Sequence, residues 1–256
     1  MKHIIIVSLL ILLSLGSACA QDSVRIYGRV TDFNNNPVDS VSVRLKENNF
    51  KNLYEVFTDR DGYFSFKALK RNYYCLYAIR LRDYSKTKLE YWAWNIPAIR
   101  DLEINPRYER MEIYGVNAFE PQAGPFDTYM IYFRPMSLTK ALELEKQKAQ
   151  GQNIKEFEKK SQARHDTLDI APSNITKEEL QVSVNHLPAE ILCITKVPEY
   201  GRGGWMYGYL IQVKKPKENS VIDFPYDQIT IVLHSNETGD MGMGECFVKR
   251  VDRKAP

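Results

Sequence analysis

Short segments in which hydrophobic and polar residues alternate run from residue 24 to about residue 134. In the first of them, VRIYGRV, alternate positions place Val24, Ile26 and Val30 on one face, with Gly28 between them. A repeat of two residues is typical of a strand that is buried on one side. The links between the segments are rich in Asn, Asp and Pro, which favour turns. Several such strands at near-regular spacing predict a β-sandwich or a barrel.

The pattern changes over residues 137–167, which are rich in Lys, Glu, Gln and Ala. These are good helix formers, and Ser137 or Thr139 can serve as the N-cap residue. Because charges of both signs are interspersed, we interpret this stretch as a mostly solvated helix or helix pair. The alternative is a face that binds a partner. The sequence therefore predicts a charged helical connector over residues 136–167.

Strand-like segments return after the connector, separated by Gly-rich or Pro-containing links. They predict a second, smaller β-sandwich-like domain over residues 168–256. The stretches GRGGWMYG and GDMGMGE run into strands, whereas a phosphate-binding loop needs a helix after its glycines. We therefore expect both to be hairpin loops. The predicted fold class is mainly β, with one sandwich over residues 21–135, the connector, and the second β-domain.

The first twenty residues, MKHIIIVSLLILLSLGSACA, have the features of a secretory signal peptide. Ala18 and Ala20 form a cleavage signal before Gln21, and the apolar run is shorter than the roughly 20 residues that span a bilayer. The alternative is a lipid anchor at Cys19, although Leu15 stands four residues before this cysteine instead of three. No later apolar run reaches spanning length. We therefore expect an exported protein with no membrane span.

Charge and cysteine content narrow the picture further. With 35 Lys and Arg against 32 Asp and Glu, the formal net charge is only +3, which does not favour nucleic acid as a partner. After cleavage of residues 1–20, the remaining cysteines are Cys75, Cys193 and Cys246, too few for a disulfide scaffold. Cys193 and Cys246 could form a bridge, or they could be small buried side chains.

The stretch TDRDGYFSF at residues 58–66 could be a calcium loop or a tight turn between two strands. If Gly62 were the glycine of an EF-hand loop, ligand positions would fall on Phe57 and Ala68, which cannot bind calcium. The flanking residues alternate as strands do. We therefore predict a hairpin in which Asp side chains accept backbone N–H groups and Gly62 adopts a positive φ.

Taken together, these segments resemble the carboxypeptidase regulatory-like domain, also called transthyretin-like or prealbumin-like, over about residues 24–115. The pattern of that family has a G-x-V-x-D opening, an Asn/Gly-x-Pro turn, a V-x-V strand and then T-D-x-x-G-x-F. The matching residues are Gly28, Val30, Asp32, Pro37, Val41, Val43, Thr58, Asp59, Gly62 and Phe64. Asn72 stands where the family often has glycine, and Asp83-Tyr84 stands where it often has Gly-Tyr. Residues 168–256 resemble no named family.

The resemblance implies a seven-stranded β-sandwich that has no catalytic residues of its own. In Gram-negative bacteria, such domains form the N-terminal part of outer-membrane nutrient receptors and cell-surface proteins. The localisation that it implies is therefore the periplasm, or the outer membrane or cell surface, of a Gram-negative bacterium.

Residues with reactive or metal-binding side chains form no recognisable motif. His165, His186 and His234 are far apart in the sequence, although the last two lie near strand ends of one predicted domain. There is no spacing typical of zinc ligands and no nucleophile motif. We therefore predict no metal site, no cofactor and no enzymatic activity.

Aromatic residues are the main candidates for binding, since the chain has 16 Tyr and three Trp. We expect Trp92 and Trp94 to lie in the core, and we predict Trp205, Tyr207 and Tyr209 as binding residues. The predicted function is a non-catalytic binding or structural module of a bacterial cell-envelope assembly, with an envelope protein or a polysaccharide as partner. The alternative is an accessory subunit or an enzyme that acts on glycans or peptides.

Overall fold

The computed structural model describes residues 22–121, 127–149, 169–201, 204–217 and 223–250. The predicted signal peptide, including Cys19, lies outside the described residues, and so does the part of the connector after residue 149.

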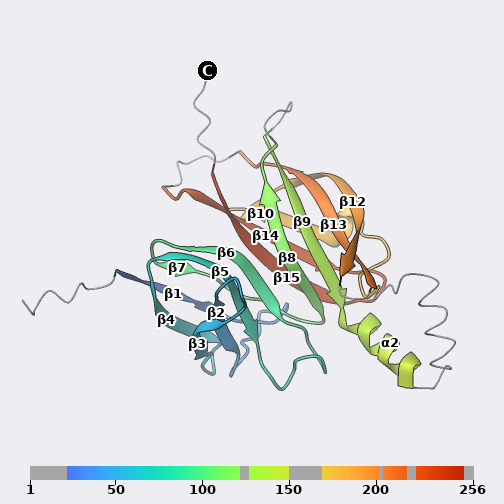
Figure 1. The fold of residues 1–256 in the computed structure, drawn as a ribbon, viewed down its shortest axis with the longest axis horizontal. Coiled ribbons are helices and arrows are strands. Elements are labelled where there is room, and N and C mark those ends of the chain that lie inside the picture. The colour runs from blue at the N-terminus through green and yellow to red at the C-terminus, as the bar shows by residue number, and fades with distance from the viewer. Residues whose placement is uncertain (1–21, 122–126, 150–168, 202–203, 218–222, 251–256) are drawn as a thin grey trace, which may run out of the picture.

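Seven strands in the first part of the chain form a sandwich, at the lower left of Figure 1. β4, β1 and β7 make a three-stranded sheet, and β3, β2, β5 and β6 lie side by side in a larger one. The strands are β1 (Ser23–Arg29), β2 (Ser42–Lys46), β3 (Asn52–Phe57), β4 (Tyr63–Leu69), β5 (Arg71–Ile79), β6 (Tyr91–Ala98) and β7 (Leu102–Glu103). Alternate residues such as Ile26, Val43 and Phe64 are buried between the two sheets. The predicted seven-stranded β-sandwich is confirmed.

The remaining strands build the second sandwich, at the upper right of Figure 1. β12, β13, β9 and β8 form a four-stranded sheet, while β11, β10, β14 and β15 continue the larger sheet of the first sandwich. These strands are β8 (Met111–Phe119), β9 (Thr128–Ser137), β10 (Leu180–Val184), β11 (Leu187–Pro188), β12 (Glu190–Gly201), β13 (Gly204–Lys214), β14 (Tyr226–His234) and β15 (Met241–Lys249). A short 3-10 helix, η1 (Lys177–Glu179), precedes β10.

One eight-stranded sheet runs through both sandwiches. Its two halves meet where β15 pairs in parallel with β6, with Gly244 opposite Trp92 and Cys246 opposite Trp94. In addition, β9 extends past the predicted boundary at residue 135 and pairs with β13. Strands from both sides of that boundary therefore share two sheets, and the division into separately folding domains stays a prediction.

Helix α2 (Leu138–Ala149) projects from the end of β9 at the lower right of Figure 1. The Ser137 hydroxyl accepts the N–H of Lys140 at 3.2 Å, which confirms Ser137 as the N-cap residue. Asp240, buried in the turn before β15, accepts hydrogen bonds from the Ser137 hydroxyl and from the amide of Thr139. The helix start is therefore fixed to the second sandwich. In the described part of the chain, no helix has the length and apolar character that crossing a membrane requires.

The turn at residues 58–66 has the predicted hairpin structure. The Asp59 carboxylate accepts the N–H groups of Asp61 at 3.0 Å and Tyr63 at 2.8 Å. Gly62 has a φ of +80°, and a Cβ there would lie 2.4 Å from the carbonyl oxygen of Val30. Only glycine fits both conditions without strain.

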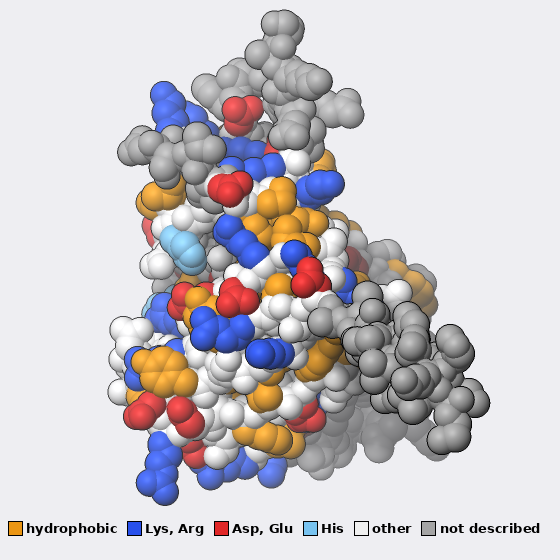
Figure 2. Space-filling view, turned by 90° about the vertical axis from the view of Figure 1, so that its left-hand side faces the viewer, with side chains coloured by type: hydrophobic (Ala, Val, Ile, Leu, Met, Phe, Trp, Pro, Cys, Tyr) orange, Lys and Arg blue, Asp and Glu red, His pale blue; other side chains and the backbone are white. Residues whose placement is uncertain are grey.

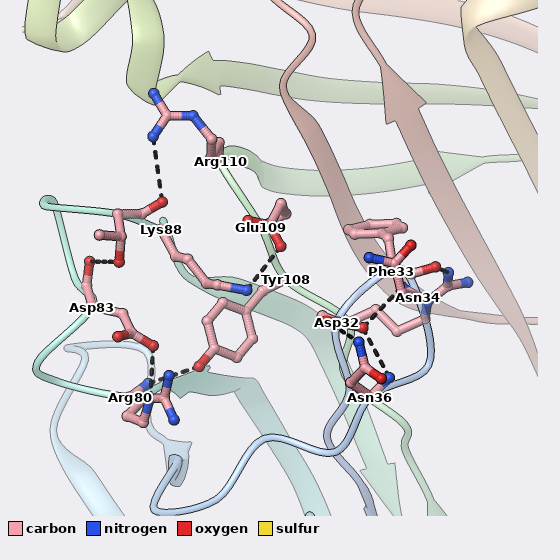
Figure 3. Close-up of polar contacts among 12 residues, drawn as sticks. Asp32, Phe33, Asn34, Asn36, Arg80, Asp83, Lys88, Tyr108, Glu109 and Arg110 are labelled. Carbon is pink, nitrogen blue, oxygen red and sulfur yellow. Dashed lines mark hydrogen bonds and ion pairs between the residues drawn. The ribbon is translucent and has the colours of Figure 1, made fainter.

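A second Asp-centred loop lies between β1 and β2. As Figure 3 shows, the Asp32 carboxylate points at the backbone of its own loop and accepts the N–H groups of Asn34 and Asn36. Two aspartates that the family resemblance singles out, Asp32 and Asp59, therefore both hold turns.

The two Gly-rich stretches differ in structure. Gly201 pairs with Gly204 at the end of the β12–β13 hairpin, so the first stretch is a hairpin as expected. The second stretch is a loop only at Gly239 and Asp240, which lie in the turn between β14 and β15, because Gly242 and Gly244 lie within β15. A Cβ on Gly242 would lie 2.1 Å from the carbonyl oxygen of Met111 in β8, and one on Gly244 would lie 2.6 Å from that of Ile113. These glycines let β8 pack directly on β15.

We expect Gly242→Ala to lower the free energy of unfolding by about 2–4 kcal/mol, because the new methyl group would collide with backbone. Chemical denaturation measures this loss. Gly239→Asn is the control: Gly239 has open space around its Cα and a φ of +72°, which asparagine tolerates, so the cost should stay below about 1 kcal/mol. Equal losses in the two variants would contradict the packing argument.

Replacing Asp59 by Ala should destabilise the protein by about 1–2 kcal/mol, because two amides of the turn lose their acceptor. Asp61→Ala removes a carboxylate from the same turn, but it leaves both of those hydrogen bonds in place. Thermal unfolding of the two variants should therefore separate them, and an Asp61→Ala loss as large as that of Asp59→Ala would refute the assigned role.

Candidate functional site

Three cavities on the surface adjoin one another because they share lining residues. The first, of about 710 Å³, shares Glu103, Asn105 and Arg107 with the second, of about 450 Å³. The second shares His186 and Thr230, among others, with the third, of about 400 Å³. Together they form a groove that starts on the three-stranded sheet of the first sandwich and ends on β10 and β14 of the second. We call this surface the groove.

The first part of the groove lies on the outer face of β4 and β1. Strand alternation buries Ile26 and turns Arg25, Tyr27 and Arg29 outward. The Arg25 guanidinium lies 4.3 Å from the centre of the Tyr27 ring, and that of Arg29 lies 5.4 Å from the Tyr63 ring. Tyr63 is 55% exposed. This part therefore offers aromatic faces next to positive charge.

Arg107 lines both the first and the second cavity. Its guanidinium donates to the carbonyl oxygen of Phe33 at 3.1 Å and lies 4.6 Å from the centre of the Phe33 ring. Phe33 belongs to the loop that Asp32 holds (Figure 3), so a rigid turn sets the position of this arginine.

The part of the groove between the sandwiches is polar. Ile229 and Ile231 of β14 point into the core of the second sandwich, so Thr230 points to the opposite face, where Glu245 of β15 lies beside it. The Glu245 carboxylate accepts hydrogen bonds from Thr230 at 2.6 Å, from Gln228 at 3.0 Å, and from the Tyr91 hydroxyl. Burial raises the pKa of Glu245, and these donors oppose that shift.

His186 lines the second and third cavities from the turn between β10 and β11. It is held in the left-handed region with a φ of +67°. Asn185, which precedes His186, donates its N–H to the carbonyl oxygen of Gln228 near the start of β14. His234 ends the same strand, so the two histidines lie near opposite ends of β14 and are not brought together. Among the described residues, no group of three or more His, Cys, Asp and Glu side chains could hold a metal ion.

Figure 2 shows the left-hand face of the view in Figure 1. Lys and Arg side chains are spread over this face, and Asp and Glu side chains lie among them. Hydrophobic side chains form small groups between the charges. A partner of this face would therefore meet a surface of mixed polarity.

The predicted binding residues occupy alternate positions of β13. Tyr207 is half-buried, with the Lys196 ammonium 4.1 Å from the centre of its ring. The Trp205 side chain lies outside the described residues. Tyr209 requires a correction, because it is only 2% exposed, stacks on Phe133, and donates its hydroxyl to the Pro172 carbonyl oxygen at 2.8 Å. It is a core residue and offers no ring face to a ligand.

The expectation that Trp92 and Trp94 lie in the core is confirmed, since both are buried. They lie on the face of the large sheet that β8 covers, in contact with Tyr114. Cys75 and Cys246 are buried free thiols, and Cys193 is exposed and also free, so Cys193 and Cys246 form no bridge.

Two buried carboxyl groups lie near Trp92 and outside the three cavities of the groove. Glu112 accepts the indole N–H of Trp92 at 2.7 Å. Burial, and then the charge of Glu90, raises the pKa of Glu112 well above its usual range. Burial raises the pKa of Glu90 to about 7, and its Oε2 atom has no hydrogen-bond partner among the described residues. These groups favour the protonated form inside the protein.

Because the folded-state pKa of Glu90 is raised, its contribution to stability is present below pH 4.5 and is lost as the pH rises through about 7. The free energy of unfolding of the wild type should fall between pH 5 and pH 8, and in Glu90→Gln this fall should be smaller, by roughly 2–3 kcal/mol at most. Thermal or chemical unfolding at several pH values in this range measures the difference. Glu47→Gln, at an exposed ion pair with Arg71, should keep the wild-type pH dependence. If Glu90→Gln also kept it, the assigned role would be wrong.

No protein-family model matches the chain, and no curated protein matches it. Among solved structures, BcpA, the major pilin subunit of Bacillus cereus, is 9% identical with a TM-score of 0.27, and the match covers 89% of this chain and 69% of the pilin. A DUF3823 family protein from Parabacteroides merdae is 8% identical with a TM-score of 0.24, covering 89% of this chain and 98% of that protein. The full-length major pilin SpaD from Corynebacterium diphtheriae is 8% identical with a TM-score of 0.23, and the match covers 92% of this chain and 69% of SpaD. Similarities with TM-scores this low carry no argument about this chain.

Proposed function

We propose that this chain is a non-catalytic, exported binding module of a bacterial cell envelope, and that its partner is a polysaccharide. The observation that carries the proposal is the groove, because its three adjoining cavities extend across both sandwiches. A surface of this kind suits a chain-like ligand that several sites contact in succession.

The side chains of the groove match the chemistry of sugars. A sugar ring has an apolar face, which stacks on an aromatic ring, and hydroxyl groups, which need donors and acceptors around it. Tyr27 and Tyr63 supply aromatic faces, while Asn105 and Gln228 supply both donors and acceptors. Most of these side chains stand on strands or directly beside them, so the sheet fixes their spacing.

The β12–β13 hairpin is a second proposed contact, for either the polysaccharide or an envelope protein. Tyr207 lies on this hairpin with the Lys196 ammonium over its ring, and Trp205 precedes Tyr207 by two positions in β13. A protein partner is the competing proposal for this region, since aromatic residues also anchor protein interfaces.

An enzyme acting on glycans is the other candidate, and the Glu90 and Glu112 carboxyl groups favour it. Glycoside hydrolysis uses two carboxyl groups, of which one has a raised pKa. However, both side chains are buried and neither lines the groove. We therefore assign them to the interior, and an assay for release of reducing ends from bound polysaccharides tests that assignment.

The binding proposal predicts that the chain retains polysaccharides on a glycan array or in affinity electrophoresis. Tyr63→Ala and Tyr27→Ala should each weaken this binding about tenfold, because each removes one stacking face. Phe57→Ala is the matched control, since Phe57 is 60% exposed on β3, away from the groove. If no polysaccharide binds, or if Phe57→Ala weakens binding as much as Tyr63→Ala does, the proposal fails.

A further inference from the structure

Arg29 and Arg107 are held in the groove by backbone carbonyl groups. The Arg29 Nε atom donates to the carbonyl oxygen of Asp61 at 2.9 Å, and the Arg107 guanidinium donates to that of Phe33 at 3.1 Å. Both carbonyls belong to turns that Asp59 and Asp32 fix. A carbonyl orients a guanidinium but does not neutralise it, so both charges stay in place.

Neither guanidinium lies within ion-pair distance of a carboxylate among the described residues. In contrast, most of the other described arginines are paired with acids, for example Arg71 with Glu47 and Arg134 with Glu199. Arg25, the third arginine of the first cavity, lies 3.6 Å from Asp101. Two arginines that face the same cavity are thus held in position without an ion-pair partner among the described residues.

The acids of the first cavity, Asp59 and Glu103, are already engaged. Asp59 accepts the amides of its own turn, and Glu103 accepts the side-chain N–H of Asn105 at 3.0 Å. The first cavity therefore has three arginines against two acids. The groups of this cavity that remain available for hydrogen bonds are mostly arginine N–H donors, and these suit carboxylate and sulfate oxygens.

We propose that the groove binds an anionic polysaccharide, and that Arg29 and Arg107 contact carboxylate or sulfate groups on successive parts of the chain. This inference rests on the proposed polysaccharide-binding function and names the chemical class of its ligand. The tyrosine faces beside Arg25 and Arg29 would take the sugar rings between the charged groups.

The test compares polygalacturonate with its carboxyl-reduced, neutral form, and dextran sulfate with dextran, by titration calorimetry at low and at physiological salt. We expect the charged polymers to bind at least tenfold more tightly than their neutral partners, and we expect salt to weaken that binding. Preference for polygalacturonate over dextran sulfate would identify carboxylate as the bound group, and the reverse preference would identify sulfate.

Arg29→Gln and Arg107→Gln should each weaken binding of the preferred polymer roughly tenfold, as loss of a hydrogen bond to a charged group does. Arg82→Gln is the matched control, because Arg82 is an exposed arginine outside the groove, and its variant should bind as the wild type does. Arg107→Lys keeps the charge and much of the packing on Phe33, so it should bind more tightly than Arg107→Gln. Melting curves establish that each variant is folded.

The outcomes separate this inference from the function on which it rests. If the protein binds a neutral polysaccharide, and the Arg29 and Arg107 variants bind it as tightly as the wild type does, the inference is overturned but the proposed binding function stands. Equal losses of affinity in the Arg82 and Arg29 variants would also overturn the inference, because general charge attraction would then explain the binding. If none of the polymers and no glycan on the array binds, the proposed function itself is refuted.

Discussion

The parallel pairing of β6 with β15 is the contact on which the rest of the structure depends. It joins two strands that are about 150 residues apart in the sequence, and so turns two four-stranded halves into one sheet. The small sheet of β4, β1 and β7 covers one face of the first half, and β8 covers the opposite face where β15 presents Gly242 and Gly244. The two halves of the large sheet are thus covered on opposite faces. The groove runs from the outer face of the small sheet onto the face of β10 and β14 that stays open in the second half.

Much of the first sandwich could be predicted from the sequence because its signals are local. Alternation identifies β1 and β2, and the Asp and Gly residues at positions 32, 59 and 62 act within their own turns. Thr58, another residue of the family pattern, is buried and binds the backbone of Val38 and Val41. The helix start at Ser137 is local in the same sense.

The pairing between distant strands could not be predicted, because alternation fixes the faces of a strand but not its neighbours. Nothing in the local pattern of β8 and β9 indicates that they join the later strands instead of the earlier ones. The sequence around Gly242 and Gly244 predicts a loop, because the strand against which these glycines pack is more than a hundred residues away. For the same reason the sequence does not predict the groove, although alternation does turn Tyr27 and Arg29 outward. The prediction for Tyr209 is wrong because a periodic pattern does not show which face of β13 is covered.

The place of β15 in the chain constrains how the protein reaches its folded state. In the described structure, β15 follows every other strand in the sequence, yet it lies in the interior of the eight-stranded sheet. Until residues 241–249 have been synthesised, β6 keeps an unpaired hydrogen-bonding edge, and such an edge attracts other chains. The strands of the first sandwich can pair with one another earlier, but the eight-stranded sheet is completed only when β15 has been made. A chain of this topology therefore gains from being kept apart from other chains until residues 241–249 are available to pair with β6.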